Sequence, residues 1–293
     1  MLKSSDKEIT VIGAGIVGIC CACYLQKSGF QVTLVDREEP AMQTSFGNAG
    51  GISPGSVTPL GMPGIWKQIP RWLLDDNAPL VIKGRYLPKA LPWLARFALQ
   101  SRPSRVRQIS KALEALNSPT FDAYQPLLED AALTQLFHRS GQLFLYRNRQ
   151  DMDKDTLTHE LRSESGASIE FLNAEEILEI EPAITPIFEA GYLMPDNGHC
   201  KDPFGLANGL VKMFVQKGGD LVKADVLDFI FDADGVSGLS TSSVVLNTRR
   251  VVIAAGVWSK TLCERLGLPV PLESHRGYHA TIENSNISLK HMC

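Results

Sequence analysis

The stretch ITVIGAGIVGICCACYLQKSGFQVTLVDR, residues 9–37, decides the fold of the chain. A β-branched apolar run leads into three glycines, a segment of small residues follows, and a second apolar run ends at Asp36. The order strand, glycine turn, helix, strand and acid is the context in which a G-x-G-x-x-G pattern indicates a dinucleotide site. We therefore predict a βαβ unit that binds a diphosphate at the start of its helix.

Each glycine of the turn has its own role in this prediction. Gly13 makes the tight turn, Gly15 lets the backbone approach a pyrophosphate, and Gly18 lets the helix pack closely on the strand. Asp36 follows Gly18 by eighteen residues, where an acid accepts the hydroxyls of an adenosine ribose.

Composition narrows the class of protein. The chain has 293 residues, enough for one large domain or two, and a net charge of −3. Because there is no basic excess to release counterions, we expect no nucleic-acid partner. The apolar run of residues 11–25 is too short to span a bilayer. We therefore predict no targeting segment and a cytoplasmic location.

Three of the six cysteines, Cys20, Cys21 and Cys23, lie in the predicted helix. Cys20 and Cys23 form a C-x-x-C pair, a spacing that elsewhere indicates redox chemistry or a metal. A helix packed on a sheet needs small residues, so we interpret these thiols as buried and inert. The histidines are scattered, and we predict no metal site.

Two further segments have patterns typical of a ligand site. Residues 44–51, TSFGNAGG, form a loop whose hydroxyls, amide and backbone N–H groups suit phosphates or a flat polar ring. Residues 250–255 are almost wholly apolar, as in a strand buried on both faces, and lead into Gly256. In open α/β sheets the ligand lies at the carboxyl edge of such strands.

Between these segments the composition changes. Prolines in residues 59–103 predict short helical pieces broken by proline. Residues 66–107 combine leucines and aromatic residues with Lys and Arg. This stretch predicts either contact with a membrane surface or helices packed on a second domain. We expect one helix over residues 109–128 and another over residues 151–166.

The remaining pattern predicts the elements of an α/β fold. Strands are expected at residues 141–146, 168–172 and 191–195, a helix at residues 204–217, and a third strand of the nucleotide domain at residues 220–226. Two or three antiparallel strands follow between residues 229 and 247. A last strand is expected at residues 271–282.

Several segments together resemble the FAD-dependent D-amino acid oxidase superfamily, and within it the bacterial D-amino acid dehydrogenases. The opening stretch matches the family's FAD fingerprint, including the Arg after the acid. Similar to later family segments, in the expected order, are TSFGNAGGISPG, PGIWKQIPRWLLDDNAPLVI, RSGQLFLYR and VVIAAGVWSKTLCERLGLPVPLESHRGYH. The resemblance extends over residues 8–282.

The resemblance implies FAD bound without a covalent link, because residues 44–51 hold no His or Cys for attachment. The residues that we assign to the cofactor on this basis are Gly13, Gly15, Ile16, Gly18, Asp36, Arg37, Thr44, Ser45, Asn48, Ala49, Gly50, Gly51, Val226, Ala255, Gly256 and Trp258. No catalytic side chain is assigned. On the substrate side, the last predicted strand offers Arg276, Tyr278 and His279, of which the first two share a face.

The expected architecture is α/β with two domains. A Rossmann-like FAD-binding domain is built from the discontinuous residues 1–58 and 198–266. An α+β substrate domain with a mixed sheet comprises residues 59–197 and 267–293. Members of the family are longer at the carboxyl end, so we interpret the chain as truncated inside the substrate domain.

The implied reaction oxidises the Cα–N bond of a D-amino acid, or a related secondary amine, to an imine. Water hydrolyses the imine to a 2-oxo acid and ammonia, and the hydride passes to the flavin. A quinone is one expected acceptor, which would place the protein on the inner face of the plasma membrane. Two alternatives stay open: a catalytically incomplete FAD-binding fragment or subunit, and a glycine or sarcosine oxidase-like enzyme that uses oxygen.

Overall fold

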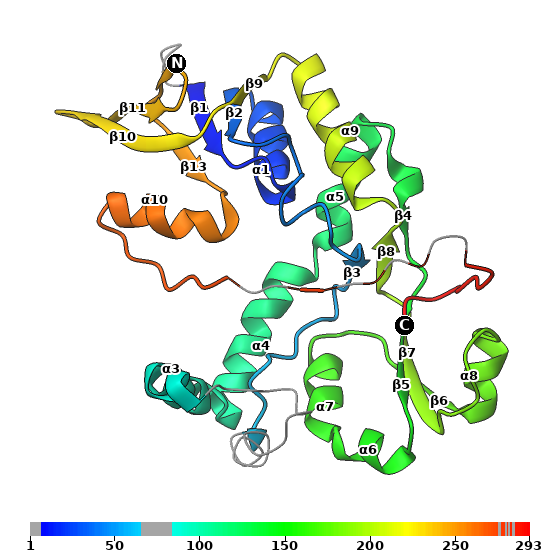
Figure 1. Cartoon of the computed structure of the whole chain (residues 1–293). Coiled ribbons are helices and arrows are strands. Elements are labelled where there is room, and N and C mark those ends of the chain that lie inside the picture. The colour runs from blue at the N-terminus through cyan, green and yellow to red at the C-terminus, as the bar shows by residue number, and fades with distance from the viewer. Residues whose placement is uncertain (1–6, 66–83, 275–276, 279, 281, 283–284) are drawn as a thin grey trace. The chain divides into compact units, whose positions relative to one another are not determined.

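The computed structural model describes residues 7–65, 84–274, 277–278, 280, 282 and 285–293. The chain divides into two compact units, each assembled from separate stretches (Figure 1). Unit 1 comprises Met1–Gly51, Ala123–His138 and Cys200–Ser285. Unit 2 comprises Ile52–Asp122, Arg139–His199 and Asn286–Cys293. Relative to the predicted domains, this division places residues 123–138 and 267–285 with the nucleotide-binding segments.

Unit 1 is built on a parallel sheet with the strand order β13-β1-β2-β9. These strands are Val251–Ile253, Glu8–Ile12, Gln31–Asp36 and Asp220–Lys223. Ile12 pairs with Ile253 on one side and with Val35 on the other. Because all these pairs are parallel, the carboxyl ends of β1, β2 and β13 lie at one edge of the sheet.

Helix α1, Ile16–Lys27, connects β1 to β2, and α9, Pro203–Gln216, packs against it (Figure 1). Small residues on α1 permit this packing, since Ala22 is fully buried and the Cys23 thiol lies 3.8 Å from the Leu210 carbonyl oxygen. Asp202 caps α9 by accepting a hydrogen bond from the Gly205 N–H group.

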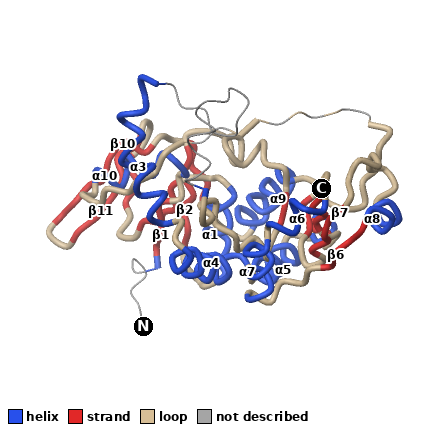
Figure 2. The backbone as a smooth tube through the Cα atoms, turned by 90° about the horizontal axis from the view of Figure 1, so that it is seen from below, coloured by secondary structure: helices blue, strands red, loops and turns tan. Residues whose placement is uncertain are grey.

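An antiparallel sheet of β10, Val226–Asp232, β11, Gly235–Thr241, and β12, Val245–Asn247, completes the core of unit 1. Figure 2 shows β10 and β11 as a long hairpin. Phe229 and Leu239 of this sheet pack with Ile12 and Val35 of the parallel sheet. Leu262 of α10, Ser259–Arg265, joins the same cluster. One buried apolar cluster therefore fixes where β1, β2 and α10 lie.

Unit 2 holds an antiparallel sheet in the order β5-β7-β6. Its strands are Gln142–Tyr146, Ala190–Met194 and Glu170–Asn173. Tyr192 in the centre of β7 is fully buried, and its ring stacks on Phe144 with 4.8 Å between centroids. The buried Arg162 guanidinium lies over the Phe144 ring and donates to the Tyr192 hydroxyl. Aromatic side chains thus form a large part of the packing around this sheet.

The described helices of unit 2 are α3, Leu87–Gln100, α4, Pro103–Asn117, α6, Arg149–Lys154, α7, Thr156–Glu164, and α8, Ala174–Ile180. A 3₁₀ turn, η2, Gly84–Tyr86, precedes α3. Asn173 and Glu176 form a capping box at the start of α8. The remaining short elements are α5, Thr120–Asp130, η3, Thr134–Leu136, β3, Gly51–Ile52, β4, Phe137–His138, β8, Gly198–Cys200, and η4, Gly256–Trp258.

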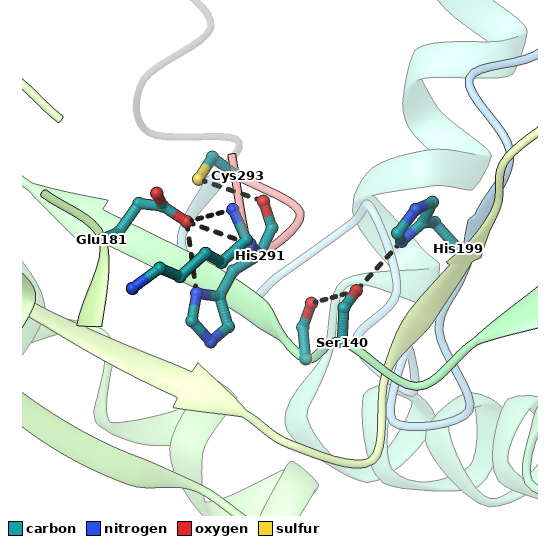
Figure 3. Close-up of polar contacts among 7 residues, drawn as sticks. Ser140, Glu181, His199, His291 and Cys293 are labelled. Carbon is teal, nitrogen blue, oxygen red and sulfur yellow. Dashed lines mark hydrogen bonds and ion pairs between the residues drawn. The ribbon is translucent and has the colours of Figure 1, made fainter. Parts of the chain in front are cut away.

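The last residues of the chain are held by Glu181 of unit 2 (Figure 3). One oxygen of this fully buried carboxylate accepts hydrogen bonds from the N–H groups of Lys290, at 2.7 Å, and His291, at 3.0 Å. Burial opposes ionisation, but these hydrogen bonds and the His291 ring outweigh it and lower the pKa of Glu181. Met292 then bridges to Gln142, so the segment lies beside β5.

Most predicted elements are confirmed, and proline accounts for two of the differences. The helix expected at residues 109–128 is two helices, α4 and α5, because Pro119 lies between them. In contrast, α3 continues through Pro92, although a proline inside a helix removes one backbone hydrogen bond. The helix expected at residues 151–166 is also two helices, α6 and α7, which meet at Asp155.

The strand expected at residues 271–282 is wrong for the part of it that the structure describes. Residues 271–274, 277–278, 280 and 282 are exposed and belong to no strand. Alternating side chains make a strand only where a neighbouring strand satisfies the backbone N–H and C=O groups. Among the described residues, no helix is both long and apolar enough to cross a bilayer.

Candidate functional site

The glycine turn after β1 is packed so closely that side chains are excluded. Gly13 has φ +106°, and a Cβ atom there would lie 2.5 Å from the Ala254 carbonyl oxygen at the end of β13. A Cβ atom on Gly18 would overlap the Gly13 carbonyl oxygen. The helix therefore begins directly against the carboxyl edge of the sheet, as predicted for these two glycines.

The first turn of α1 is left open to an anion. Gly15 is the N-cap residue, with extended backbone and no side-chain cap, and the first turn contains no acid. Ser45, from the loop of residues 44–51, accepts a hydrogen bond from the Ile16 N–H group at 2.9 Å. A Cβ atom on Gly15 would meet only the Ser45 hydroxyl, at 3.3 Å. Backbone N–H groups and the helix dipole at this position suit a diphosphate.

The acid at the end of β2 faces the same turn. One Asp36 oxygen accepts a hydrogen bond from the Ala14 N–H group at 2.6 Å, and the other accepts from Glu38 at 2.9 Å. The carboxylate is half-buried, and each oxygen keeps a lone pair for a further donor. A ribose with two adjacent hydroxyl groups supplies such donors.

Arg37 and Trp258 bring the ends of two strands together. The Arg37 guanidinium, after β2, lies 4.5 Å from the centroid of the Trp258 ring, after β13. The indole is 41% exposed, so part of its surface stays accessible to a flat ligand. The sequence did not predict this contact, because residues 37 and 258 are far apart in the chain. Each of the two residues is assigned to the cofactor separately.

Few hydrogen bonds fix the conformation of the loop of residues 44–51. The Asn48 side chain donates to the Ser45 carbonyl oxygen and accepts from the Gly50 N–H group, both at 2.8 Å. Gly50, at φ +72°, accepts a hydrogen bond from the Cys200 N–H group at 2.7 Å. The exposed residues of this loop include Thr44, Asn48, Ala49 and Gly51. The loop therefore offers the Thr44 side chain and exposed backbone next to the start of α1.

The other residues predicted to bind the cofactor lie in unit 1 and differ in how closely they are packed. Ala255 packs on the apolar cluster below the sheet edge, whereas a Cβ atom on Gly256 would meet nothing within 4 Å. Val226 begins β10 and packs on the same cluster. The geometry fits a dinucleotide because a helix start with a glycine N-cap, an acid and an aromatic surface meet at one sheet edge. Contact of each residue with the cofactor stays a prediction.

The predicted substrate residues are not brought together by the described structure. Arg276 and His279 lie outside the described residues. Tyr278 is 90% exposed and belongs to no strand. Their role stays a prediction, without the strand on which it was based.

Two thiols of α1, those of Cys20 and Cys23, are affected by burial. Burial raises the pKa of Cys20 to about 12 and that of Cys23 to about 11, so both are protonated at neutral pH. The described cysteines form no disulfide. Within the same part of the chain, no group of three or more His, Cys, Asp or Glu residues could hold a metal ion.

Known proteins share this fold and much of this sequence. The model of the family described as "DAO: FAD dependent oxidoreductase" matches residues 8–291. A curated D-amino-acid oxidase from Bradyrhizobium diazoefficiens is 35% identical over 281 residues, which cover 95% of this chain and 66% of that protein. The chain thus spans just under two thirds of the length of this relative.

Solved structures share the fold at low sequence identity. A glycine oxidase from Bacillus cereus matches with a TM-score of 0.60 and 18% identity, over 88% of this chain and 57% of that one. An L-proline dehydrogenase from P. horikoshii matches with a TM-score of 0.61 and 19% identity, over 89% and 56%. Together with the glycine turn and its acid, the family match shows that the chain belongs to the DAO family of FAD-dependent oxidoreductases, with FAD as its cofactor.

Proposed function

We propose that the chain is the flavin-binding part of an enzyme that oxidises the Cα–N bond of a D-amino acid or a related secondary amine. The observation that carries this proposal is the single sheet edge at which the Gly13–Gly18 turn, Asp36 and Trp258 meet. The 35% identity to a D-amino-acid oxidase over 95% of the chain supports the substrate class.

The residues of unit 1 would bind and orient the cofactor in a defined direction. The start of α1 at Gly15, with the Ser45 hydroxyl beside it, would hold the diphosphate. Asp36 would accept the ribose hydroxyl groups, and the Arg37–Trp258 pair would border the adenine end. The exposed groups of residues 44–51 would lie toward the flavin. Binding is proposed to be non-covalent, since this loop holds neither His nor Cys.

When bound, FAD supplies an acceptor for the hydride that leaves the substrate α-carbon. The amine must be neutral at that moment, and its loss of two electrons and two protons leaves an imine. Water then adds to the imine carbon, and ammonia leaves, or a primary amine where the substrate is a secondary amine, which gives the 2-oxo acid. We assign no protein side chain to proton transfer.

The alternative is a chain that binds FAD without turnover. The chain covers 66% of the D-amino-acid oxidase from Bradyrhizobium diazoefficiens. Substrate chemistry is the other open point, because the glycine oxidase and L-proline dehydrogenase structures share the fold at identities that carry no substrate assignment.

Anaerobic reduction of the bound flavin tests the proposal. The purified chain is loaded with FAD, and flavin absorbance is followed after addition of D-amino acids, their L-enantiomers, glycine and sarcosine. We expect bleaching by at least one D-amino acid, with little by its L-enantiomer. Bleaching by glycine or sarcosine alone would favour the oxidase-like alternative, and a bound flavin that no substrate bleaches would favour the FAD-binding fragment.

The electron acceptor is tested with the same protein. We propose a quinone, which predicts slow hydrogen peroxide formation in air and faster turnover with an added quinone. Full turnover with oxygen alone would contradict this part of the proposal. Release of all flavin into the supernatant after acid precipitation is expected for non-covalent binding.

A further inference from the structure

Two consecutive helices of unit 2 differ in what they bury. In α4, Val106 is fully buried against Val57 and Leu161, and Ser110 is buried as well. In α3, no side chain that the structure describes is buried. Several of its exposed residues are nevertheless apolar. Leu91 is 55% exposed, Trp93 is 56% exposed and Leu99 is 49% exposed.

Among the basic residues of α3 and α4, only Arg107 has an acidic partner within the described part of the chain. Arg107 of α4 forms ion pairs with Glu160 and Glu164 of α7. Within the described part of the chain, Lys89 and Arg96 of α3 have no acidic partner. Residues 84–113 contain seven Lys or Arg residues and no Asp or Glu, in a chain whose net charge is −3. These cations are Arg85, Lys89, Arg96, Arg102, Arg105, Arg107 and Lys111.

Helix geometry places the two kinds of side chain on α3 side by side. Lys89 and Arg96 are seven residues apart and so lie on the same face. Leu91, Ala95 and Leu99 are exposed and four residues apart, so they form an apolar stripe beside this face, whereas Leu94 and Ala98 are half-buried. Trp93 follows Lys89 by four residues and shares its face, and the Trp93 ring stacks on Phe97 with 5.0 Å between centroids.

The helix is held at its carboxyl end. A Cβ atom on Gly61 would lie 2.8 Å from the Ser101 hydroxyl and 3.1 Å from the Phe97 ring. Ser101 is buried and its hydroxyl donates to the Phe97 carbonyl oxygen at 2.9 Å. The last turn of α3 is thus packed on unit 2, while Leu91 and Trp93 are left exposed.

We infer that α3 is an interfacial helix that lies in the surface of a membrane with anionic lipids. An exposed apolar stripe, an exposed aromatic side chain and an acid-free cationic face are the features with which a short helix binds such a surface. The cations would contact the headgroups, and Leu91, Leu99 and Trp93 would reach the headgroup–acyl boundary. Charge complementarity selects this partner, because a neutral or cationic surface would leave the basic residues unpaired.

Vesicle sedimentation of the intact chain tests the inference. Vesicles of neutral phosphatidylcholine are compared with vesicles in which roughly one third of the lipid is anionic phosphatidylglycerol. We expect binding to the anionic vesicles that weakens at high salt. The variant Lys89→Glu/Arg96→Glu should lose at least about 30-fold in partitioning, from two basic residues worth about 1 kcal/mol each.

The matched control is Arg147→Glu/Lys212→Glu, which changes the net charge equally at two exposed positions outside α3. This control should retain most of the binding. Circular dichroism checks that both variants are folded. Equal loss in the two variants, or equal binding to neutral and anionic vesicles, would overturn the inference.

Insertion is tested with lipids brominated on the acyl chain. These should quench tryptophan fluorescence of the bound chain, and Trp93→Phe should remove most of the quenched signal. If Leu91→Asp instead abolishes a concentration-dependent dimer in sedimentation analysis, and no vesicle binding is seen, the face is an interface between copies and the inference is wrong. Neither test depends on bound FAD or on turnover.

Discussion

The glycine turn and the loop of residues 44–51 form two sides of the same site, but they are built differently. The turn is closed by backbone packing, so a methyl group on Gly18 would overlap the Gly13 carbonyl oxygen. The loop is held by the Asn48 side chain and a few backbone hydrogen bonds, and much of it is exposed. The comparison suggests that the diphosphate side is preformed and that the loop side adjusts to its ligand.

The largest effect is expected when the turn is broken. Gly18→Ala places a Cβ atom inside the van der Waals contact of a backbone oxygen, which cannot move without shifting β1. We expect the free energy of unfolding to fall by about 3 kcal/mol or more and FAD binding to be lost. Denaturant unfolding of the variant measures this.

Gly277→Ala is the control for that change, because a Cβ atom there meets nothing within 4 Å and needs no left-handed backbone. Its unfolding free energy should stay within about 0.5 kcal/mol of the wild type. If Gly18→Ala is as stable as this control, the turn is less rigid than the comparison requires.

The next effect concerns the acid beside the turn. Asp36→Asn keeps an acceptor for the Ala14 N–H group but removes the charge that strengthens hydrogen bonds to ribose hydroxyls. Loss of a charge-assisted bond of about 1.5–3 kcal/mol should raise the Kd for FAD about 10- to 100-fold. Flavin fluorescence titration measures the Kd, and an unchanged value would remove Asp36 from the site.

A smaller effect is expected when the loop is loosened. Asn48→Ala removes two hydrogen bonds within the loop while leaving the turn intact. The unfolding free energy should change by less than about 1 kcal/mol, because these groups are exposed, and the Kd for FAD should rise about fivefold. Gln43→Ala, an exposed change just before the loop, is the control and should alter neither quantity.

The smallest effect is expected at the aromatic surface. Trp258→Ala removes the ring over which the Arg37 guanidinium lies, an interaction worth about 0.5–1 kcal/mol at an exposed position. The Kd for FAD should rise about two- to fivefold, whereas Trp258→Phe should recover most of the affinity. A Phe variant as weak as the Ala variant would show that the indole acts by another contact.

The sequence predicted the glycine turn well because its signal is local. Gly18 contacts Gly13 and Asp36 contacts Ala14 within one βαβ unit, so the local spacing predicts these contacts. The confirmed strands β9 to β12 likewise follow from alternating apolar residues and short turns.

Contacts between distant segments could not be predicted from spacing. The hydrogen bond from Ile16 to Ser45 and the stacking of Arg37 on Trp258 depend on tertiary packing, which leaves no periodic pattern in the sequence. The strand expected at residues 271–282 is the reverse case, because here a local pattern predicted an element that the described residues do not form. Its alternation is real, but a strand also needs a partner, and none of its described residues has one.

The central claim is that unit 1 binds the diphosphate of FAD at the start of α1, and Gly15→Ala tests it most directly. The added methyl group meets only the Ser45 hydroxyl, at 3.3 Å, so the variant should fold, and its unfolding curve checks this. The methyl group would nevertheless occupy the space in which the diphosphate approaches the backbone. Titration with FAD should give a Kd at least about 100-fold higher than that of the wild type, as expected when several phosphate hydrogen bonds are lost. A folded Gly15→Ala variant that binds FAD with the wild-type Kd would contradict the claim.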